Sequence, residues 1–204
     1  MYCNHRKDIK LDSHELKQFS KKNLSYLVYK DLKERGLIVK VEDSNLRLFD
    51  RNISTKGQAS AVVFAMKFDE IIELNKVINE IKKGLKRRIQ ISIVDSDNDT
   101  VYYVAKLVNW SQTKLKKGEK NTITDEILSE LITKGYKINS GLKFGAHYRV
   151  YDYDSKHAPW LIQKVEKNTT WLDIARMVRV GHGVNKTVVL AYNRYWISFD
   201  WIKP

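Results

Sequence analysis

Hydrophobic residues follow two spacings along the chain, one typical of helices and the other of strands. Within residues 12–35, Leu24, Val28 and Leu32 recur every four positions, which places them on one side of a helix. Gly36 follows, and glycine is a common residue just past the end of a helix. The pattern therefore predicts one long helix, or two short ones, before the first strand.

Strand-like runs and a second helix come next. Residues 69–84 predict the helix, because Ile71, Leu74 and Ile78 form an apolar stripe along it. The acidic segment DSDNDT, residues 95–100, separates two alternating runs and predicts a hairpin turn. Strands are predicted over residues 37–41, 46–49, 59–66, 88–95 and 100–108.

A polar, lysine-rich segment, residues 110–121, has no periodicity and is interpreted as a linker. Beyond it the same order of elements returns, which indicates an internal duplication with about 100 residues per unit. The second set consists of helices over residues 122–135 and 170–180 and strands over residues 136–139, 147–153, 159–165, 186–192 and 195–202.

The predicted fold class is α+β, with two tandem similar units that each pack helices against a mixed β-sheet. The first unit spans residues 1–109 and the second spans residues 122–204. Gly36 and Gly135 occupy corresponding places after the first helix of each unit. If one copy is degenerate, the other is expected to hold the active site and the degenerate one to serve as scaffold.

Charge and composition narrow the possible partners. The 204 residues carry a formal net charge of +13, with 37 Lys and Arg against 24 Asp and Glu. Such an excess is typical of a protein that binds a polyanion, most often nucleic acid, although a lysine-rich genome would give the same balance. Cys3 is the single cysteine, which excludes a disulfide framework and a cysteine-based zinc site.

The N-terminal sequence MYCNHRKDIK is polar and charged, so no signal peptide is predicted. No apolar run approaches the length of a membrane span. We therefore expect a cytoplasmic protein with no membrane attachment.

Three residues of the second unit have no intact counterpart in the first. Tyr151 aligns with Phe49, which keeps the ring and loses the hydroxyl, and Lys186 aligns with Arg87. The segment of the first unit that aligns with the surroundings of His157, residues 51–58, contains no histidine. A structural tyrosine tolerates replacement by phenylalanine, whereas a tyrosine that transfers protons does not. Tyrosine, histidine and lysine are common residues, so a purely structural role stays open for each.

Tyr151, His157 and Lys186 suit the cleavage of RNA by its own 2′-hydroxyl group without a metal ion. This reaction needs a base, an acid and a cation beside the crowded phosphate. Histidine titrates near neutral pH and can be the acid, and lysine can be the cation. A tyrosine has an ordinary pKa of about 10 and becomes a base only where cations favour its anion. Arg149, on the same strand face, is the expected additional cation.

The stretches GLKFGAHYRVYDYDSKHAPW (141–160) and ARMVRVGHGVNKTVVLA (175–191) resemble the catalytic core of the archaeal tRNA-splicing endonucleases. The resemblance implies a restriction-endonuclease-like core and no metal or other cofactor. It implies cleavage of precursor tRNA at bulge-helix-bulge sites, which leaves a 2′,3′-cyclic phosphate and a 5′-hydroxyl. By the same resemblance, Tyr151 is the general base, His157 the general acid and Lys186 the group that stabilises the transition state.

The family also holds a bulged base between two arginines. Arg179 matches the first arginine, and near the expected second position stands Trp201, which can stack in its place. The acidic turn resembles the family's assembly loop, so Asp95, Asp97 and Asp99 are expected to dock into a partner chain. Ordinary turn chemistry would explain the same three residues.

A chain with one catalytic unit and one loop-bearing unit can form a two-fold dimer, so a homodimer is expected. Family units usually carry a sizeable N-terminal domain, for which neither unit has room, and a heteromer therefore stays possible. The alternative function is a non-catalytic, RNA-binding subunit of a heteromeric splicing endonuclease. A basic DNA-binding domain is a third possibility, but the chain has no groove-reading helix or finger signature.

Overall fold

The computed structural model describes residues 24–42, 45–50, 58–83, 88–113, 125–152 and 155–204. The first part of the helix expected over residues 12–35 lies outside the described residues. Its remainder is α2 (Leu24–Glu34), which ends just before Gly36. Gly36 and Gly135 both have a positive φ, 79° and 83°, which a residue without a Cβ adopts at no steric cost.

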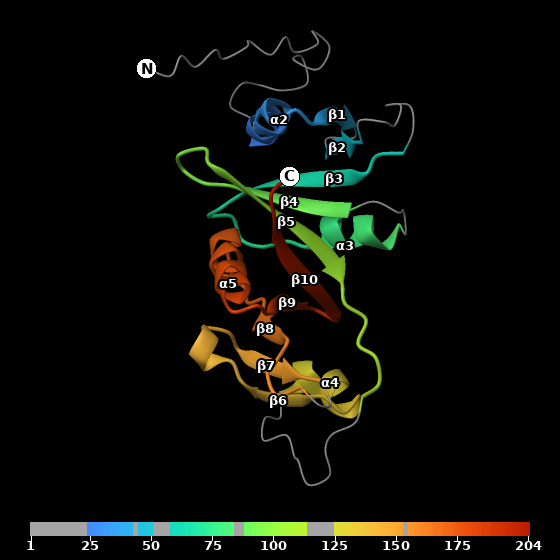
Figure 1. Ribbon diagram of the computed structural model, residues 1–204, viewed down its shortest axis with the longest axis vertical. Coiled ribbons are helices and arrows are strands. Elements are labelled where there is room, and N and C mark those ends of the chain that lie inside the picture. Colours follow the sequence, from blue (N-terminus) through green and yellow to red (C-terminus); the bar gives the residue numbers. More distant parts are fainter. Residues whose placement is uncertain (1–23, 43–44, 51–57, 84–87, 114–124, 153–154) are drawn as a thin grey trace.

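The described strands form one sheet that crosses the whole molecule (Figure 1). Its strands are β1 (Ile38–Glu42), β2 (Asn45–Phe49), β3 (Ala61–Lys67), β4 (Arg88–Val94), β5 (Thr100–Leu107), β6 (Lys137–Ser140), β7 (Tyr148–Tyr151), β8 (Trp160–Lys164), β9 (Thr187–Tyr192) and β10 (Tyr195–Ile202).

The strand order is β1-β2-β3-β4-β5-β10-β9-β8-β7-β6, so each half of the chain contributes five neighbouring strands. The pairs β3–β4 and β8–β9 are parallel and the other pairs are antiparallel. The two halves join where β5 pairs with β10, for example Ala105 with Phe199. The expectation of a separate sheet in each unit is therefore replaced by one continuous sheet.

Helices follow the same order in both halves. The first half has α2 before its strands and α3 (Asn75–Lys82) between β3 and β4. The second half has the short helices η1 (Glu126–Leu128) and α4 (Ser129–Thr133) before its strands, η2 (Leu142–Phe144) between β6 and β7, and α5 (Trp171–Gly183) between β8 and β9. A parallel pair of strands needs a crossover connection, which α3 and α5 supply here.

Strand register confirms the sequence alignment at the position that distinguishes the two halves. Ile38 pairs with Phe49 at the end of β2, and Lys137 pairs with Tyr151 at the end of β7. Phe49 therefore occupies in the first half the place that Tyr151 occupies in the second.

The largest hydrophobic core takes side chains from both halves of the sheet and from α3 and α5. Tyr103 and Ile91 contribute from the first half, and Phe199 and Leu190 from the second. Two smaller cores lie on the opposite face, one under α2 and the other under α4, because neighbouring strand residues point to opposite faces. Among the described residues, no helix is both long and apolar enough to cross a membrane.

The second helix is shorter than the residue spacing predicts. Residues 69–84 were expected to be helical, but α3 begins at Asn75 and Ile71 is 60% exposed. The segment before α3 instead hydrogen-bonds across to the second half, where Ile72 N–H donates to Thr169 at 2.9 Å and Trp171 N–H donates to Glu70 at 3.1 Å. These long-range backbone partners replace the first helical turn.

Trp110 belongs to the core of the second half, although residues 110–121 were expected to be a linker. Its side chain is 5% exposed and meets Tyr136, Trp160 and Trp196 edge to face at 5.1–5.8 Å. Residues 114–124 lie outside the described residues, so the domain boundaries stay a prediction.

Candidate active site

The GLKFG sequence forms a tight turn that presents Phe144 beside the end of the sheet. Gly141 is required there, because a Cβ on it would lie 2.5 Å from the carbonyl oxygen of Ala146. Gly145 ends the turn with a φ of 66°. The N–H of Gly141 donates to the carbonyl of His147 at 2.9 Å, which fixes the turn against β7.

Cations gather around the Phe144 ring. The ammonium of Lys186 lies 5.4 Å from the ring centroid and the guanidinium carbon of Arg149 lies 6.0 Å from it. Lys143 also approaches it, at 5.9 Å. Aromatic rings attract cations through their quadrupole. The Phe144 ring therefore partly offsets the mutual repulsion of the three cationic side chains around it.

Tyr151 lies at the end of β7, on the same strand face as Arg149. The Arg149 guanidinium is 5.9 Å from the Tyr151 ring centroid, and the Lys137 ammonium is 6.0 Å from it. The Nε of Arg149 donates to the carbonyl of Ser140 at 2.7 Å, which holds the guanidinium in place. Tyr151 is thus half-buried between two cations.

Lys186 lies just before β9, where α5 approaches the sheet closely. Its N–H donates to the carbonyl of Gly181 at 2.9 Å. A Cβ at Gly181 would lie 2.6 Å from Cγ2 of Val188 and 2.9 Å from the Lys186 carbonyl. The Lys186 ammonium donates to the carbonyl of Ala158, 2.5 Å away. This contact brings the ammonium next to the loop that carries His157.

The structure therefore brings the three predicted residues to one end of the second half of the sheet. The Lys186 ammonium donates to Ala158, the residue after His157. The Phe144 ring lies near both Lys186 and Arg149, and the Arg149 guanidinium in turn lies near the Tyr151 ring. His157 is exposed. Among the described residues, no hydrogen bond joins the three side chains to one another. The part played by Phe144 was not predicted, although the GLKFG motif pointed to its neighbourhood.

Arg179 and Trp201 contact each other within the chain. The Arg179 guanidinium carbon lies 5.1 Å from the Trp201 ring centroid, the His182 ring meets Trp201 edge to face at 5.1 Å, and the Lys203 ammonium lies 5.8 Å away. Below them, burial raises the pKa of Tyr103 to about 12, against the opposing effect of Arg179. The pair forms a cationic and aromatic surface, but leaves no gap for a base between its two members.

The two corresponding positions of the first half, both among the described residues, hold no such pair. Ile89 pairs with Ala105 as Val188 pairs with Phe199, so Leu107 occupies the place of Trp201. Glu80, which aligns with Arg179, is 7% exposed and forms an ion pair with Lys83 at 2.6 Å.

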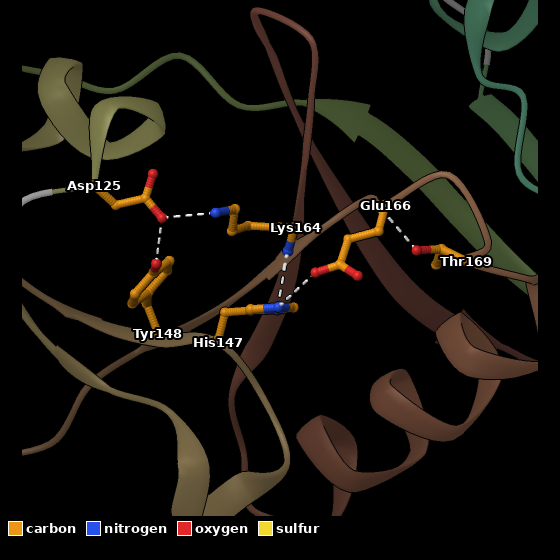
Figure 2. A network of polar contacts seen from close by, with 6 residues as sticks. All are labelled: Asp125, His147, Tyr148, Lys164, Glu166 and Thr169. Atoms are coloured by element: carbon orange, nitrogen blue, oxygen red, sulfur yellow. Dashed lines mark hydrogen bonds and ion pairs between the residues drawn. The ribbon is translucent and has the colours of Figure 1, made fainter.

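A second polar network lies on the opposite side of β7 and β8 (Figure 2). The carboxylate of Asp125 accepts hydrogen bonds from the Lys164 ammonium at 2.7 Å and from the Tyr148 hydroxyl. Lys164 first, and then Tyr148, lower the pKa of Asp125 to about 2. Burial and the bond to Asp125 raise the pKa of Tyr148 to about 12. This network ties η1 to the sheet and gives Tyr148 a structural role.

His147 continues this network toward α5. Its Nδ1 accepts from the N–H of Lys164 at 3.3 Å, so Nε2 carries the proton and faces Glu166 Oε1 at 3.4 Å. The N–H of Glu166 donates to Thr169 Oγ1 at 2.8 Å. Among the described residues, no three His, Cys, Asp or Glu side chains come together in a way that would hold a metal ion.

The acidic hairpin between β4 and β5 has a cap made by its first aspartate. One carboxylate oxygen of Asp95 accepts from the N–H groups of Asp97 and Asp99, both at 2.9 Å. Asn98 has a φ of 66°, which the turn requires. All three aspartates are exposed. Turn chemistry therefore accounts for Asp95 and leaves the Asp97 and Asp99 carboxylates without a role inside the turn.

Comparison with known proteins places the chain in one family. The family model described as tRNA intron endonuclease, catalytic C-terminal domain, matches residues 23–103 and 126–195, which include both halves of the sheet. A tRNA-splicing endonuclease of Pyrococcus abyssi is 29% identical over 168 residues, which cover 76% of this chain and 93% of that protein.

Two further relatives carry the same name. The protein of Saccharolobus solfataricus is 32% identical over 132 residues, 60% of this chain and 68% of its own length. The protein of Pyrococcus horikoshii is 39% identical over 84 residues, which are 38% of this chain, so that the chain spans only about half (49%) of that relative. These matches confirm the resemblance expected from the GLKFG and HGVNK regions, and the chain belongs to the tRNA intron endonuclease family.

Proposed function

We propose that this chain cleaves precursor tRNA at intron boundaries of the bulge-helix-bulge type. Its relatives are named tRNA-splicing endonucleases. The observation that carries the proposal is the contact of the Lys186 ammonium with the Ala158 carbonyl. This contact puts a fixed cation beside His157, while Phe144 and Arg149 connect the same cation to Tyr151.

In the proposed reaction Tyr151 accepts the proton of the 2′-hydroxyl next to the scissile phosphate. The 2′-oxygen then attacks phosphorus, and the bond from phosphorus to the 5′-oxygen breaks. His157 gives its proton to that departing oxygen, which leaves a 2′,3′-cyclic phosphate and a 5′-hydroxyl. Lys186 stabilises the negative charge that grows on the phosphate oxygens in the transition state.

The placement of the side chains supports these roles. The Lys137 ammonium and the Arg149 guanidinium both lie about 6 Å from the Tyr151 ring, so the site around the proposed base is cationic. His157 is exposed on the loop before β8, where a proton donor can reach a leaving group on bound RNA. Lys186 is held at the backbone on one side and by Phe144 on the other, so its position does not depend on the substrate.

The same order of strands in both halves, with a helix before the first strand and another between the third and fourth, supports a tandem duplication of one restriction-endonuclease-like unit. The first copy then serves as scaffold, because Phe49, Glu80 and Leu107 stand where the second has Tyr151, Arg179 and Trp201. The ordered pair of Arg179 and Trp201 is proposed to receive a bulged base against its surface.

The acidic hairpin is proposed to dock Asp97 and Asp99 on the second half of another chain. The resulting homodimer would have two active sites, and a heteromer with another chain would use the same hairpin. The cytoplasmic location stays a prediction.

The experiment is cleavage of a bulge-helix-bulge precursor RNA by the purified chain in EDTA, with analysis of the product ends. We expect cleavage with cyclic phosphate and 5′-hydroxyl ends, and His157→Ala should lower the rate at least about 100-fold without changing RNA affinity. A requirement for added Mg²⁺ would contradict the mechanism. Tight RNA binding without cleavage would favour the non-catalytic subunit instead.

A further inference from the structure

A cleft of about 500 Å³ opens on the α5 face of the second half, next to the GLKFG turn. It lies between η2, the residues after β8 and the outer side of α5. The residues that define it are Phe144, His147, Glu166, Arg176, Met177 and Val180.

The cleft shares a wall with the proposed catalytic residues. Phe144 lines it, and the same ring lies 5.4 Å from the Lys186 ammonium and 6.0 Å from the Arg149 guanidinium. A molecule in the cleft is therefore one aromatic ring away from the cations proposed to hold the scissile phosphate. RNA bound at those cations would carry its next nucleotide past the mouth of the cleft.

The walls of the cleft combine an apolar interior with a polar rim. Phe144, Met177 and Val180 form the apolar part. The apolar side chain of Val180 is 43% exposed, so it is accessible to a bound molecule. His147 Nε2 and the Glu166 carboxylate stand at the rim. A flat, apolar face with hydrogen-bonding edges is the chemistry of a nucleobase, and pockets for such molecules have this composition.

The charges of the rim argue against a second phosphate. Glu166 and Asp173 place two carboxylates at the cleft against the single guanidinium of Arg176. An anionic group would gain little there, whereas the neutral edge of a base can donate to the carboxylate of Glu166 and accept from Arg176. Base and phosphate of one RNA segment thus find separate, adjoining surfaces.

We propose that this cleft binds an unpaired nucleobase next to the scissile phosphate, an inference that rests on the proposed function. It lies apart from the Arg179 and Trp201 surface, since neither of those residues lines it. Its role is to hold the RNA in register with Tyr151 and Lys186.

The test fills the cleft with Val180→Trp. The position is partly exposed, so the larger side chain enters the cleft without replacing a buried core residue. Affinity is measured with a precursor RNA that has a 2′-deoxy nucleotide at the cleavage position, so that it binds without being cut. Abasic nucleotides are placed one at a time on either side of the scissile phosphate.

We expect Val180→Trp to raise Kd about tenfold, because the base loses its apolar contacts. One abasic position should have a similar effect on the wild-type protein and no further effect on Val180→Trp. The matched control is Ile71→Trp, which fills a different cleft in the first half from a position 60% exposed. It should leave Kd within about twofold.

An unchanged Kd for Val180→Trp, or effects that add at every abasic position, would overturn the proposal. If Val180→Trp lowers the melting temperature, Val180→Glu tests the same contact with a smaller side chain. If the wild-type chain does not bind the RNA at all, the proposed function itself is contradicted.

Discussion

The ends of β2 and β7 are the same structural position in the two halves, yet only the end of β7 carries a phenolic hydroxyl group. Phe49 and Tyr151 each have a lysine ammonium 6.0 Å from the ring, contributed by Lys40 and Lys137. Both aromatic rings therefore have a lysine of the neighbouring strand close by, although Lys137 is paired with its ring and Lys40 lies two residues further along β1. What the second half adds is the hydroxyl group.

The neighbouring arginines differ in what they contact. In the first half, Arg47 forms an ion pair with Glu42 at 2.7 Å. In the second half, Arg149 lies over the rings of Tyr151 and Phe144, and Gly141 occupies the place of Glu42 by strand register. The GLKFG turn thus replaces an acid that would neutralise the arginine. Because no carboxylate stands at the position of Glu42 in the second half, the charge of Arg149 beside Tyr151 is not neutralised as that of Arg47 is.

A large effect is expected from removal of Lys186, whose aligned residue in the first half, Arg87, lies outside the described residues. Lys186→Ala should lower the cleavage rate about 100- to 1000-fold, because a fixed charge next to the reacting phosphate is lost. Lys143→Ala is the control, since Lys143 lies 5.9 Å from the same Phe144 ring but has no bond to Ala158. Single-turnover kinetics measure both, and equal losses would contradict a specific role for Lys186.

The acidic hairpin between β4 and β5 extends the comparison of the two halves to the assembly of chains. Asp97→Asn combined with Asp99→Asn should weaken the proposed dimer about 10- to 100-fold, because the charges proposed to dock are gone. The fold should persist, since Asp95 still caps the turn through the N–H groups of both residues. Native mass measured against protein concentration tests this, and an unchanged dimer would rule out the hairpin as a docking element.

The approach of α5 to β9 gives a third test with a built-in control. Gly181→Ala should destabilise the protein by about 1–3 kcal/mol, because the new Cβ would meet Val188 at 2.6 Å. Gly183→Ala, two residues later in the same helix, meets nothing within 4 Å and should be neutral or stabilising by up to about 1 kcal/mol. Denaturant unfolding compares them; equal stabilities would contradict the close approach.

The smallest effect concerns the Asp125 network of the second half. Asp125→Asn should cost about 1–2 kcal/mol at pH 7, because the partly exposed carboxylate loses its bond to Lys164. The pKa of Asp125 is lowered to about 2, so this contribution is complete above pH ~4 and is lost as pH falls through 2. Unfolding of both proteins between pH 7 and 2 measures it, and a difference that does not shrink with acid would contradict the network.

Alternating apolar and polar residues were sufficient to predict the strands, because successive side chains of a strand point to opposite faces of the sheet. Gly36 and Gly135 also marked the ends of corresponding helices correctly. The start of α3 was wrong, because the backbone around Ile71 pairs with residues about 100 positions away. Trp110 was missed for the same kind of reason: its aromatic partners come from three separate segments.

The site was predictable where the two halves could be compared, as at Tyr151 and Phe49. It was not predictable where contacts depend on the path of a turn. Nothing in the spacing of Asp125 and Lys164 indicates their ion pair, because 39 residues separate them. Likewise, Phe144 lies against Lys186 only because Gly141 and Gly145 shape the turn between β6 and β7.

The most direct test of the central claim is the single-turnover cleavage rate of Tyr151→Phe on a bulge-helix-bulge precursor RNA in EDTA. This change gives the second half the residue that the first half has, and Phe49 shows that the fold accepts it. The rate should fall by about 100- to 10,000-fold while RNA affinity and melting temperature stay unchanged. A rate within about twofold of wild type would show that the hydroxyl transfers no proton, and the account of the second half as the catalytic one would fail with it.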